Sequence, residues 1–221
     1  MNASTQGQLA YYAAAGSVVS GVGPGTAKQL VLSNGISGPQ FSDFPERLFI
    51  PAANCNNATG GAGWSIGSGG SVSCRAGVNN LGGYITISDT ASTFATFQIT
   101  LPEDWDSTVN PYIRLQVAST DNASGHTIIP TIQVACYKGD GSTTDDVAPN
   151  AAHALSTLTT NTTNHQFWST ANTQMNATDM ANCAAGSLVQ ITVGRATDTA
   201  TNAQFYGATV TIPRLLTVQA N

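Results

Sequence analysis

Charged side chains are scarce in this 221-residue sequence: Asp, Glu, Lys and Arg together make up 9% of it, well below the level of about a quarter in typical soluble domains. The formal net charge is −5. Without a basic cluster there is no electrostatic footprint for nucleic acid, so we exclude that class of partner. No apolar run is long enough to cross a bilayer, which excludes membrane insertion. Neutral Thr, Asn and Ser side chains must therefore cover the surface, which suits an extracellular protein packed beside copies of itself.

The sequence also lacks a catalytic constellation. Gly63–Gly67 reads GWSIG and matches the G-x-S-x-G pattern, but its flanks are glycine-rich instead of a strand and a helix. Glu103, Asp104 and Asp106 crowd one turn, whereas glycosidase chemistry needs two carboxylates that face each other across a sugar. We expect these three to point apart into water. The chain is therefore predicted not to be an enzyme and to hold no cofactor.

Metal-binding motifs are weak or missing. No CxxC or HxxxH spacing is present, which argues against zinc, and His126, His153 and His165 are expected in three separate surface loops. The stretch Asp140–Asp146 alternates oxygen-bearing side chains in the manner of a calcium loop, but the glycine and the terminal glutamate of an EF-hand are missing. We predict a polar connector there and leave calcium as the alternative.

Four cysteines fall into two local groups. Cys55 and Cys74 bracket a loop rich in glycine and serine, and closing such a loop would remove much entropy from the unfolded chain. Cys136 ends one alternating segment, and Cys183 lies just before another. Four cysteines allow three connectivities. We predict the two local pairs, Cys55 with Cys74 and Cys136 with Cys183, which implies an oxidising compartment.

Period-two alternation of apolar and polar residues predicts strands through most of the chain. The clearest are 84–88, 94–101, 113–117, 189–193 and 206–212, with further strands expected over 28–33, 47–52 and 127–137. The segment 151–158 is ambiguous between a helical turn and extended chain, and 195–202 is predicted to be a hairpin-like connection. About eight strands with almost no helix indicate an all-β fold, an antiparallel two-sheet β-sandwich or jelly roll.

The central feature is the stretch 94–117, in which two strands are joined by a corner. Pro102 ends the first strand, and acidic and Asn residues supply turn formers before alternation resumes at Ile113. Trp105 is expected to be buried in this corner as an apolar anchor. We predict that the two strands lie in the middle of the sandwich.

The N-terminal segment is punctuated by Gly and Pro and is predicted to form an extended arm over residues 1–26, ahead of a jelly-roll domain over 27–221. Its stretch LAYYAAAGSVVSG imitates the core of a secretion signal, but no Lys or Arg precedes it, so we expect an ordered arm that is kept. The apolar patch of Leu9, Tyr11 and Tyr12 is a candidate docking arm. A frayed tail is the alternative.

Two tryptophans stand in polar surroundings. Trp64 lies in the glycine-rich loop, and Trp168 follows Phe167 in a stretch that we expect to close one end of the sandwich. Exposed aromatic rings stack on sugars in carbohydrate-binding proteins, so Trp64 and Trp168 are candidate glycan contacts. Burial at the end of the sandwich is the alternative for both.

Several segments together resemble the jelly-roll structural module of tailed-bacteriophage virion proteins, over about residues 94–213. They are LPEDW at 101–105 with the strand that follows, AAGSLVQITV at 184–193, TDTAT at 197–201 and FYGATVTI at 205–212. The chain departs from that module in its Cys136/Cys183 pair and in its long Asn/Thr loop. The resemblance implies a non-enzymatic virion structural protein of a tailed phage, used in head decoration or as a tail-fibre or receptor-binding part.

Such a protein would be exposed on the virion surface and extracellular after release. Its expected partners are other virion proteins of the capsid or tail, further copies of itself in a homo-oligomer, and a host surface glycan. The alternative function is a secreted bacterial carbohydrate-binding or adhesin module, which has the same kind of fold and surface. A depolymerase is the third hypothesis, and it is disfavoured because the sequence offers no pair of carboxylates suited to acid/base catalysis.

Overall fold

The structure of the protein is a computed structural model, and it describes the following residues. They are 9–12, 19–22, 30–34, 37–42, 45–52, 65–66, 73–75, 83–87, 94–119, 121, 123–139, 141, 148–161, 166–200 and 203–215. These residues contain no α-helix, and none of them belongs to a helix that could cross a membrane.

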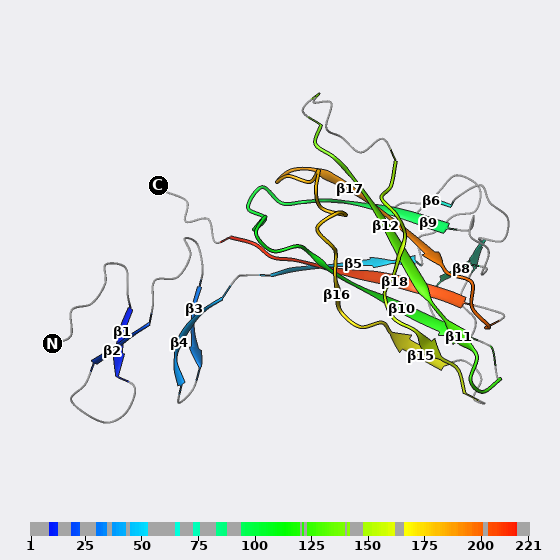
Figure 1. Cartoon of the computed structure of the whole chain (residues 1–221), viewed down its shortest axis with the longest axis horizontal. Coiled ribbons are helices and arrows are strands. Elements are labelled where there is room, and N and C mark those ends of the chain that lie inside the picture. Colours follow the sequence, from blue (N-terminus) through cyan, green and yellow to red (C-terminus); the bar gives the residue numbers. More distant parts are fainter. Residues whose placement is uncertain are drawn as a thin grey trace.

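Two antiparallel sheets form the sandwich (Figure 1). The larger, seven-stranded sheet contains β5 (Glu46–Pro51), β7 (Ser73–Arg75), β8 (Tyr84–Ile87), β10 (Tyr112–Ser119), β15 (Gln166–Ser169), β16 (Thr173–Gln174) and β18 (Ala203–Ile212). The smaller, five-stranded sheet contains β6 (Ser65–Ile66), β9 (Phe94–Thr100), β12 (Pro130–Tyr137), β13 (His153–Ala154) and β17 (Leu188–Arg195). The predicted two-sheet jelly-roll sandwich is confirmed.

The hydrophobic core lies between the two sheets, and it follows from the alternation in the sequence. In β10 the odd-numbered residues Ile113, Leu115 and Val117 are fully buried, whereas Arg114 between them is exposed. One face of each long strand is therefore apolar and covered by the opposite sheet. The largest fully buried side chains are Phe97, Phe205, Ile85, Ile87, Leu101, Ile113, Leu115, Ile128, Ile132, Met175 and Ile191.

The central stretch 94–117 is a link between the sheets. β9 pairs with β17 in the smaller sheet, and β10 pairs with β18 in the larger one, so the corner carries the chain from one sheet to the other. Trp105 is only 5% exposed and its indole Nε1 donates to the Val109 carbonyl oxygen at 3.2 Å. The prediction that this tryptophan is buried in the corner is confirmed.

The connection 195–202 corrects a prediction, because it is not a hairpin. β17 belongs to the smaller sheet and β18 to the larger one. The crossing is organised by a buried ion pair of Arg195 with Asp198, in which Nε lies 2.8 Å from Oδ2 and Nη2 contacts Oδ1. Nη2 also donates to the Ala200 carbonyl oxygen. These bonds hold the turn by which the chain passes from the smaller sheet to the larger one. The alternation pattern alone predicted a hairpin-like connection here.

The N-terminal strands form two small hairpins of their own. β1 (Leu9–Tyr12) pairs with β2 (Val19–Val22), and β3 (Leu30–Asn34) pairs with β4 (Ser37–Ser42). Both hairpins lie beyond the end of the sandwich at which β5 begins (Figure 1). The strand expected over 28–33 is thus present as β3, paired with β4 instead of with a sandwich strand. The division of the chain into an arm over 1–26 and a domain over 27–221 stays a prediction.

Two further segments settle open points in the sequence. Residues 151–158 are extended, with β13 at His153–Ala154 and β14 (Leu158–Thr159) paired to β11 (Thr127–Ile128). The predicted strand over 127–137 is broken at Ile129, and Pro130 is the first residue of β12. The first position of a strand suits a residue that cannot donate a backbone hydrogen bond.

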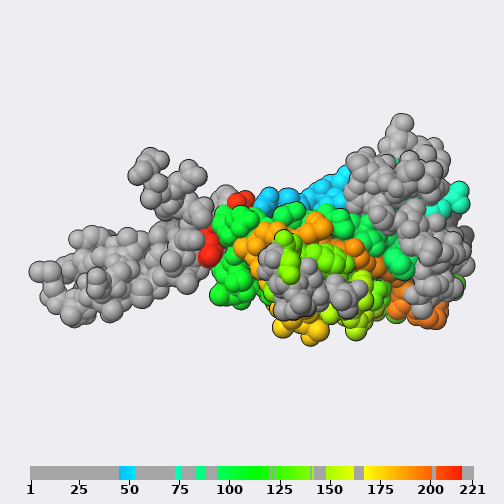
Figure 2. All heavy atoms as spheres, turned by 90° about the horizontal axis from the view of Figure 1, so that it is seen from above, coloured from blue at the N-terminus to red at the C-terminus, as the bar shows by residue number. Residues whose placement is uncertain are grey.

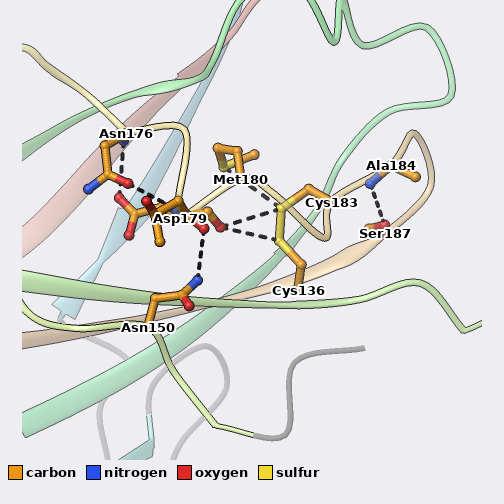
Figure 3. Close-up of a disulfide and its surroundings, with 9 residues drawn as sticks. Cys136, Asn150, Asn176, Asp179, Met180, Cys183, Ala184 and Ser187 are labelled. Atoms are coloured by element: carbon orange, nitrogen blue, oxygen red, sulfur yellow. Dashed lines mark hydrogen bonds between the residues drawn. A yellow bond between two sulfur atoms is a disulfide. The ribbon is translucent and has the colours of Figure 1, made fainter. Parts of the chain in front are cut away.

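A disulfide joins Cys136 of β12 to Cys183, as predicted, with the two Cα atoms 5.2 Å apart (Figure 3). It fastens the turn over 176–184 to the smaller sheet. In that turn the Asp179 backbone N–H donates to Asn176 Oδ1 at 2.8 Å, and the Asn176 N–H donates to Asp179 Oδ2 at 3.1 Å. Cys74 is also disulfide-bonded. Cys55 lies outside the described residues, so the pairing of those two stays a prediction.

Candidate functional site

The outer face of the larger sheet carries aromatic side chains that the sandwich does not bury. Phe205 and Ile85 are paired in the register of β18 with β8, and both are fully buried. Because side chains alternate along a strand, the adjacent Tyr206 and Tyr84 point to the opposite, outer face. Their ring centroids lie 5.5 Å apart with a tilt of 35°.

A third ring joins them from the neighbouring edge of the sheet. In the pairing of β15 with β10, Trp168 lies opposite the buried Val117, and Phe167 lies opposite Ala118. Phe167 therefore faces outward; it is 58% exposed, and its centroid is 5.5 Å from that of Tyr206 in an edge-on arrangement. We call Tyr84, Tyr206 and Phe167 the aromatic cluster.

A β-bulge aims Tyr206 into this cluster. Gln116 lies opposite Gly207 and Val117 lies opposite Phe205, so Tyr206 is the extra residue of β18 and has no direct partner in β10. Burial and the neighbouring Tyr84 raise the pKa of Tyr206 above its ordinary value. The phenol is therefore neutral at physiological pH and serves as a hydrogen-bonding group on an otherwise apolar ring.

Phe49 of β5 adds a second exposed ring on the same face. It is 57% exposed and lies opposite Thr209, while the partly buried Leu48 and Ile50 on either side of it pack against the core. A Cβ built at Gly207 would come 2.9 Å from Phe49 Cε2, so the ring lies against this glycine. The atoms of β5 are visible in blue at the surface in Figure 2. Glycine at 207 thus lets the Phe49 ring rest directly on the sheet.

Neutral hydrogen-bonding groups lie between the rings. Gln116 Nε2 donates to Thr209 Oγ1 at 3.2 Å, and the Tyr206 hydroxyl lies 3.4 Å from Gln204 Oε1. Gln116 Oε1 has no hydrogen-bond partner among the described residues. Rings interleaved with amides and hydroxyls are the surface chemistry that recognises an amphipathic ligand, one with both apolar C–H faces and hydroxyl groups.

The residues proposed from sequence as glycan contacts are placed differently from this cluster. Trp168 packs partly buried against the hydrophobic core, on the inner face of β15. Trp64 lies outside the described residues. The glycan contacts proposed for these two tryptophans stay predictions. For the docking arm formed by Leu9, Tyr11 and Tyr12, the structure describes the backbone strand β1 alone, so this too stays a prediction.

The carboxylates of the corner correct an expectation, because two of the three do not point freely into water. Asp106 is 8% exposed and its Oδ1 accepts from the Thr108 N–H at 3.0 Å and from the Thr108 hydroxyl at 2.6 Å. Asp104 is held by Arg214 through two hydrogen bonds. Glu103 is exposed, as expected. Asp106 is thus held by a local turn and Asp104 by a distant arginine, so both acids that a catalytic hypothesis would require have structural partners.

The described histidines are also less isolated than the sequence suggested. His126 Nδ1 lies 2.9 Å from Asp121 Oδ2, and His153 Nδ1 lies 3.5 Å from Asp179 Oδ2. Within the described ranges no group of three or more His, Cys, Asp or Glu side chains could hold a metal ion. His165 and all of Asp140–Asp146 except Gly141 lie outside the described residues, as does the Gly63–Gly67 motif except for the backbone of β6.

The aromatic cluster was not found from the sequence, because its members come from three strands that are distant along the chain. The usable signal was present in each strand: Phe167 and Trp168 are adjacent, so one of them must face away from the core, and the same holds for Phe205 and Tyr206. What the sequence could not supply was the order of the strands β15, β10, β18 and β8 in the sheet.

No protein-family model and no curated protein match this chain. Among solved structures, it is similar to the CBM22-1 xylan-binding domain of Paenibacillus barcinonensis Xyn10C, with 12% identity and a TM-score of 0.43 over 80% of this chain and 99% of that one. A CBM22 xylan-binding domain has 13% identity and a TM-score of 0.41 over 76% and 94% of the two chains. The xylan-binding module CBM15 has 14% identity and a TM-score of 0.39 over 79% and 99%. These neighbours are carbohydrate-binding modules, and likeness at this level assigns no ligand to this chain.

Proposed function

We propose that this protein is a non-catalytic glycan-binding module and that the aromatic cluster on the outer face of its larger sheet is the binding surface. The observation that carries the proposal is the 58% exposure of Phe167 beside the Tyr84–Tyr206 pair. Single exposed apolar side chains are ordinary, but grouped aromatic rings on one face mark an interaction surface.

The chemistry of the surface favours a sugar over an apolar partner. A pyranose presents C–H groups that pack on an aromatic ring and hydroxyls that bond to amides, and both kinds of group alternate on this face. The Tyr206 hydroxyl can donate or accept a hydrogen bond on this face. The structural use of Asp104 and Asp106 supports binding without turnover. The Cys136–Cys183 disulfide supports a place of action outside the reducing cytosol.

A glycan array followed by calorimetry on the best ligand tests this proposal. Phe167→Ala should weaken binding at least tenfold, since it removes the most exposed ring. Leu188→Ala is the matched control: Leu188 is a large exposed apolar residue at 37%, but it lies on the smaller sheet. Retention of no glycan by the wild-type protein would overturn the proposal, as would equal affinity of the wild-type protein and the Phe167 variant.

The virion role implied by the phage resemblance is the second candidate function. The observation that favours it is the pair of N-terminal hairpins, β1–β2 and β3–β4, which form separate sheets beyond the sandwich and suit docking to a particle or to another copy. A glycan-binding head-decoration or tail-fibre part would combine both candidates. Antibody labelling of purified particles tests the location, and particles without label would exclude it.

A further inference from the structure

The arginines of the chain differ in whether they form ion pairs. Arg195 and Arg214 are each paired with acidic side chains. Arg47, Arg75 and Arg114 are exposed, and none of them has an ion-pair partner among the described residues. In a chain with only seven Lys and Arg residues, three arginines without a described ion-pair partner are a large share.

All three lie on the outer face of the larger sheet, among the rings described above. Arg75 of β7 pairs with Tyr84 in the register. Arg114 of β10 lies opposite Thr209, whose other neighbour is Phe49. Arg47 lies opposite Thr211, one row further along β5 and β18.

No described carboxylate lies at the outward positions of these strands. The outward residues are Arg47, Phe49, Pro51, Ser73, Arg75, Tyr84, Thr86, Tyr112, Arg114, Gln116, Ala118, Phe167, Ser169, Gln174, Gln204, Tyr206, Gly207, Thr209 and Thr211. Their formal charge is +3, from the three arginines, on a chain whose net charge is −5. The sandwich thus concentrates positive charge on the face that carries the exposed rings.

Protection of sheet edges does not account for this arrangement. Arginine on an edge strand discourages pairing with other chains, and this could explain Arg47 on β5 and Arg75 on β7. Arg114 lies in β10, which has β18 on one side and β15 and β16 on the other. Protection of an edge therefore does not apply to Arg114.

We propose that the glycan bound by this face is an acidic polysaccharide whose uronate carboxylates pair with Arg47, Arg75 and Arg114. This inference rests on the proposed glycan-binding function. A guanidinium fork matches a carboxylate in shape and donates two parallel hydrogen bonds to it. The rings hold the sugar faces, and the arginines select the charge.

The spacing of the arginines favours a sparsely charged polymer over nucleic acid. Arg47 and Arg114 lie two strands apart and two residues apart in register, which is roughly 12 Å at the usual strand and residue spacings. Arg75 lies three strands from Arg114 and about three residues away in register, roughly 17 Å. Duplex DNA carries about one charge per 1.7 Å of its axis and is bound by dense clusters of Lys and Arg. An acidic polysaccharide carries at most one carboxylate per sugar, and isolated arginines can contact such a polymer at every second or third sugar.

The test compares acidic polymers with their neutralised forms. Polygalacturonate, alginate and hyaluronan are each titrated in two forms: the unesterified polymer, called the free acid here, whose carboxylates are ionised at neutral pH, and the fully methyl-esterified polymer. A DNA duplex of equal length is a further probe. We expect at least tenfold tighter binding of one or more free acids than of the matched ester, with affinity that falls as NaCl is raised from 50 to 500 mM.

Variants then test whether the arginines give the preference for the acid over the ester. Arg114→Ala should lose about three- to tenfold in affinity for the acid and leave affinity for the ester unchanged, and Arg114→Lys should recover part of the loss. Lys138→Gln, which removes one positive charge at the end of β12 on the smaller sheet, is the control and should bind as the wild-type protein does.

Equal binding of acid and ester would overturn this inference and leave the glycan-binding proposal in place. Binding of neither form of any polymer, together with a silent glycan array, would overturn both; preferential binding of DNA would overturn the inference in favour of a nucleic-acid partner.

Discussion

Arg214 holds Asp104 by two parallel hydrogen bonds, Nε to Oδ1 at 2.8 Å and Nη2 to Oδ2 at 3.0 Å, across 110 positions of sequence. Arg214 Nη1 also reaches Glu46 Oε2 at 3.1 Å, at the start of β5. The Leu215 N–H donates to the Asp104 carbonyl oxygen at 2.7 Å. One arginine thus ties the end of the last strand to the corner between the sheets and to the first strand of the sandwich.

Arg214→Gln should lower the free energy of unfolding by about 1 kcal/mol, the upper part of the range for partly exposed ion pairs. The two parallel hydrogen bonds and the partial burial of Asp104 place the expected loss of stability in the upper part of this range instead of near zero. Urea unfolding at low and high salt measures the effect. Arg114→Gln is the matched control, with no ion pair to lose, and it should leave stability unchanged. An equal loss in both variants would show that the fork adds nothing beyond its charge.

Trp105→Ala should destabilise the protein by about 3–5 kcal/mol, because it empties a buried site of the size of an indole. Trp105→Phe should cost less, since it keeps most of the apolar volume and loses the hydrogen bond to the Val109 carbonyl oxygen. Thermal or urea unfolding gives both values. Phe167→Ala, at an exposed position, should stay within about 0.5 kcal/mol of wild type. Comparable losses at Trp105 and Phe167 would contradict the burial of the corner.

Replacing Cys136 and Cys183 together by Ala should lower stability by up to about 4 kcal/mol, the chain-entropy value for a loop of this length. The two cysteines are 47 positions apart in the sequence. Urea unfolding without reductant measures the change.

Thiol titration of denatured, unreduced wild-type protein tests both predicted pairs. We expect no reactive thiol. Two reactive thiols would refute one of the two pairs, and mapping of the labelled peptides would show which. Four would refute both.

The pH dependence of stability should contain a contribution from Asp179. Burial raises the pKa of this carboxyl above its ordinary value, against the opposing effects of the Asn176 N–H and of His153. The folded state then holds the proton more tightly than the unfolded chain does. The contribution of Asp179 to the free energy of unfolding is therefore largest below the ordinary pKa and is lost as pH rises through the folded pKa.

Asp179→Asn cannot ionise and keeps an oxygen for the Asn176 N–H, so it should gain stability relative to wild type as pH rises through that window. Urea unfolding from pH 3 to pH 8 gives the difference at each pH. Glu103→Gln removes one negative charge at an exposed position and is the control for the change in net charge. A difference for Asp179→Asn that falls with rising pH would mean that contact with His153 outweighs burial.

Much of the fold could be predicted from the sequence because strand alternation is a local property. The strands at 84–87, 94–100, 112–119 and 188–195 were found to within a few residues, as was the burial of Trp105. The partner of each strand was beyond prediction. The segments on either side of 195–202 belong to different sheets, and the Arg195–Asp198 pair that makes this possible has nothing to distinguish it in a sequence.

The binding surface shows the same division. The sequence determined which side chains must face away from the core, since adjacent residues in a strand point to opposite faces: Phe167 opposite to Trp168, and Tyr206 opposite to Phe205. Only the tertiary structure decided that these outward residues gather on one sheet with three arginines that have no described ion-pair partner. Hydrogen bonds between strands far apart in the chain set that order, and the energy that selects it is the burial of a common core, which depends on all strands together.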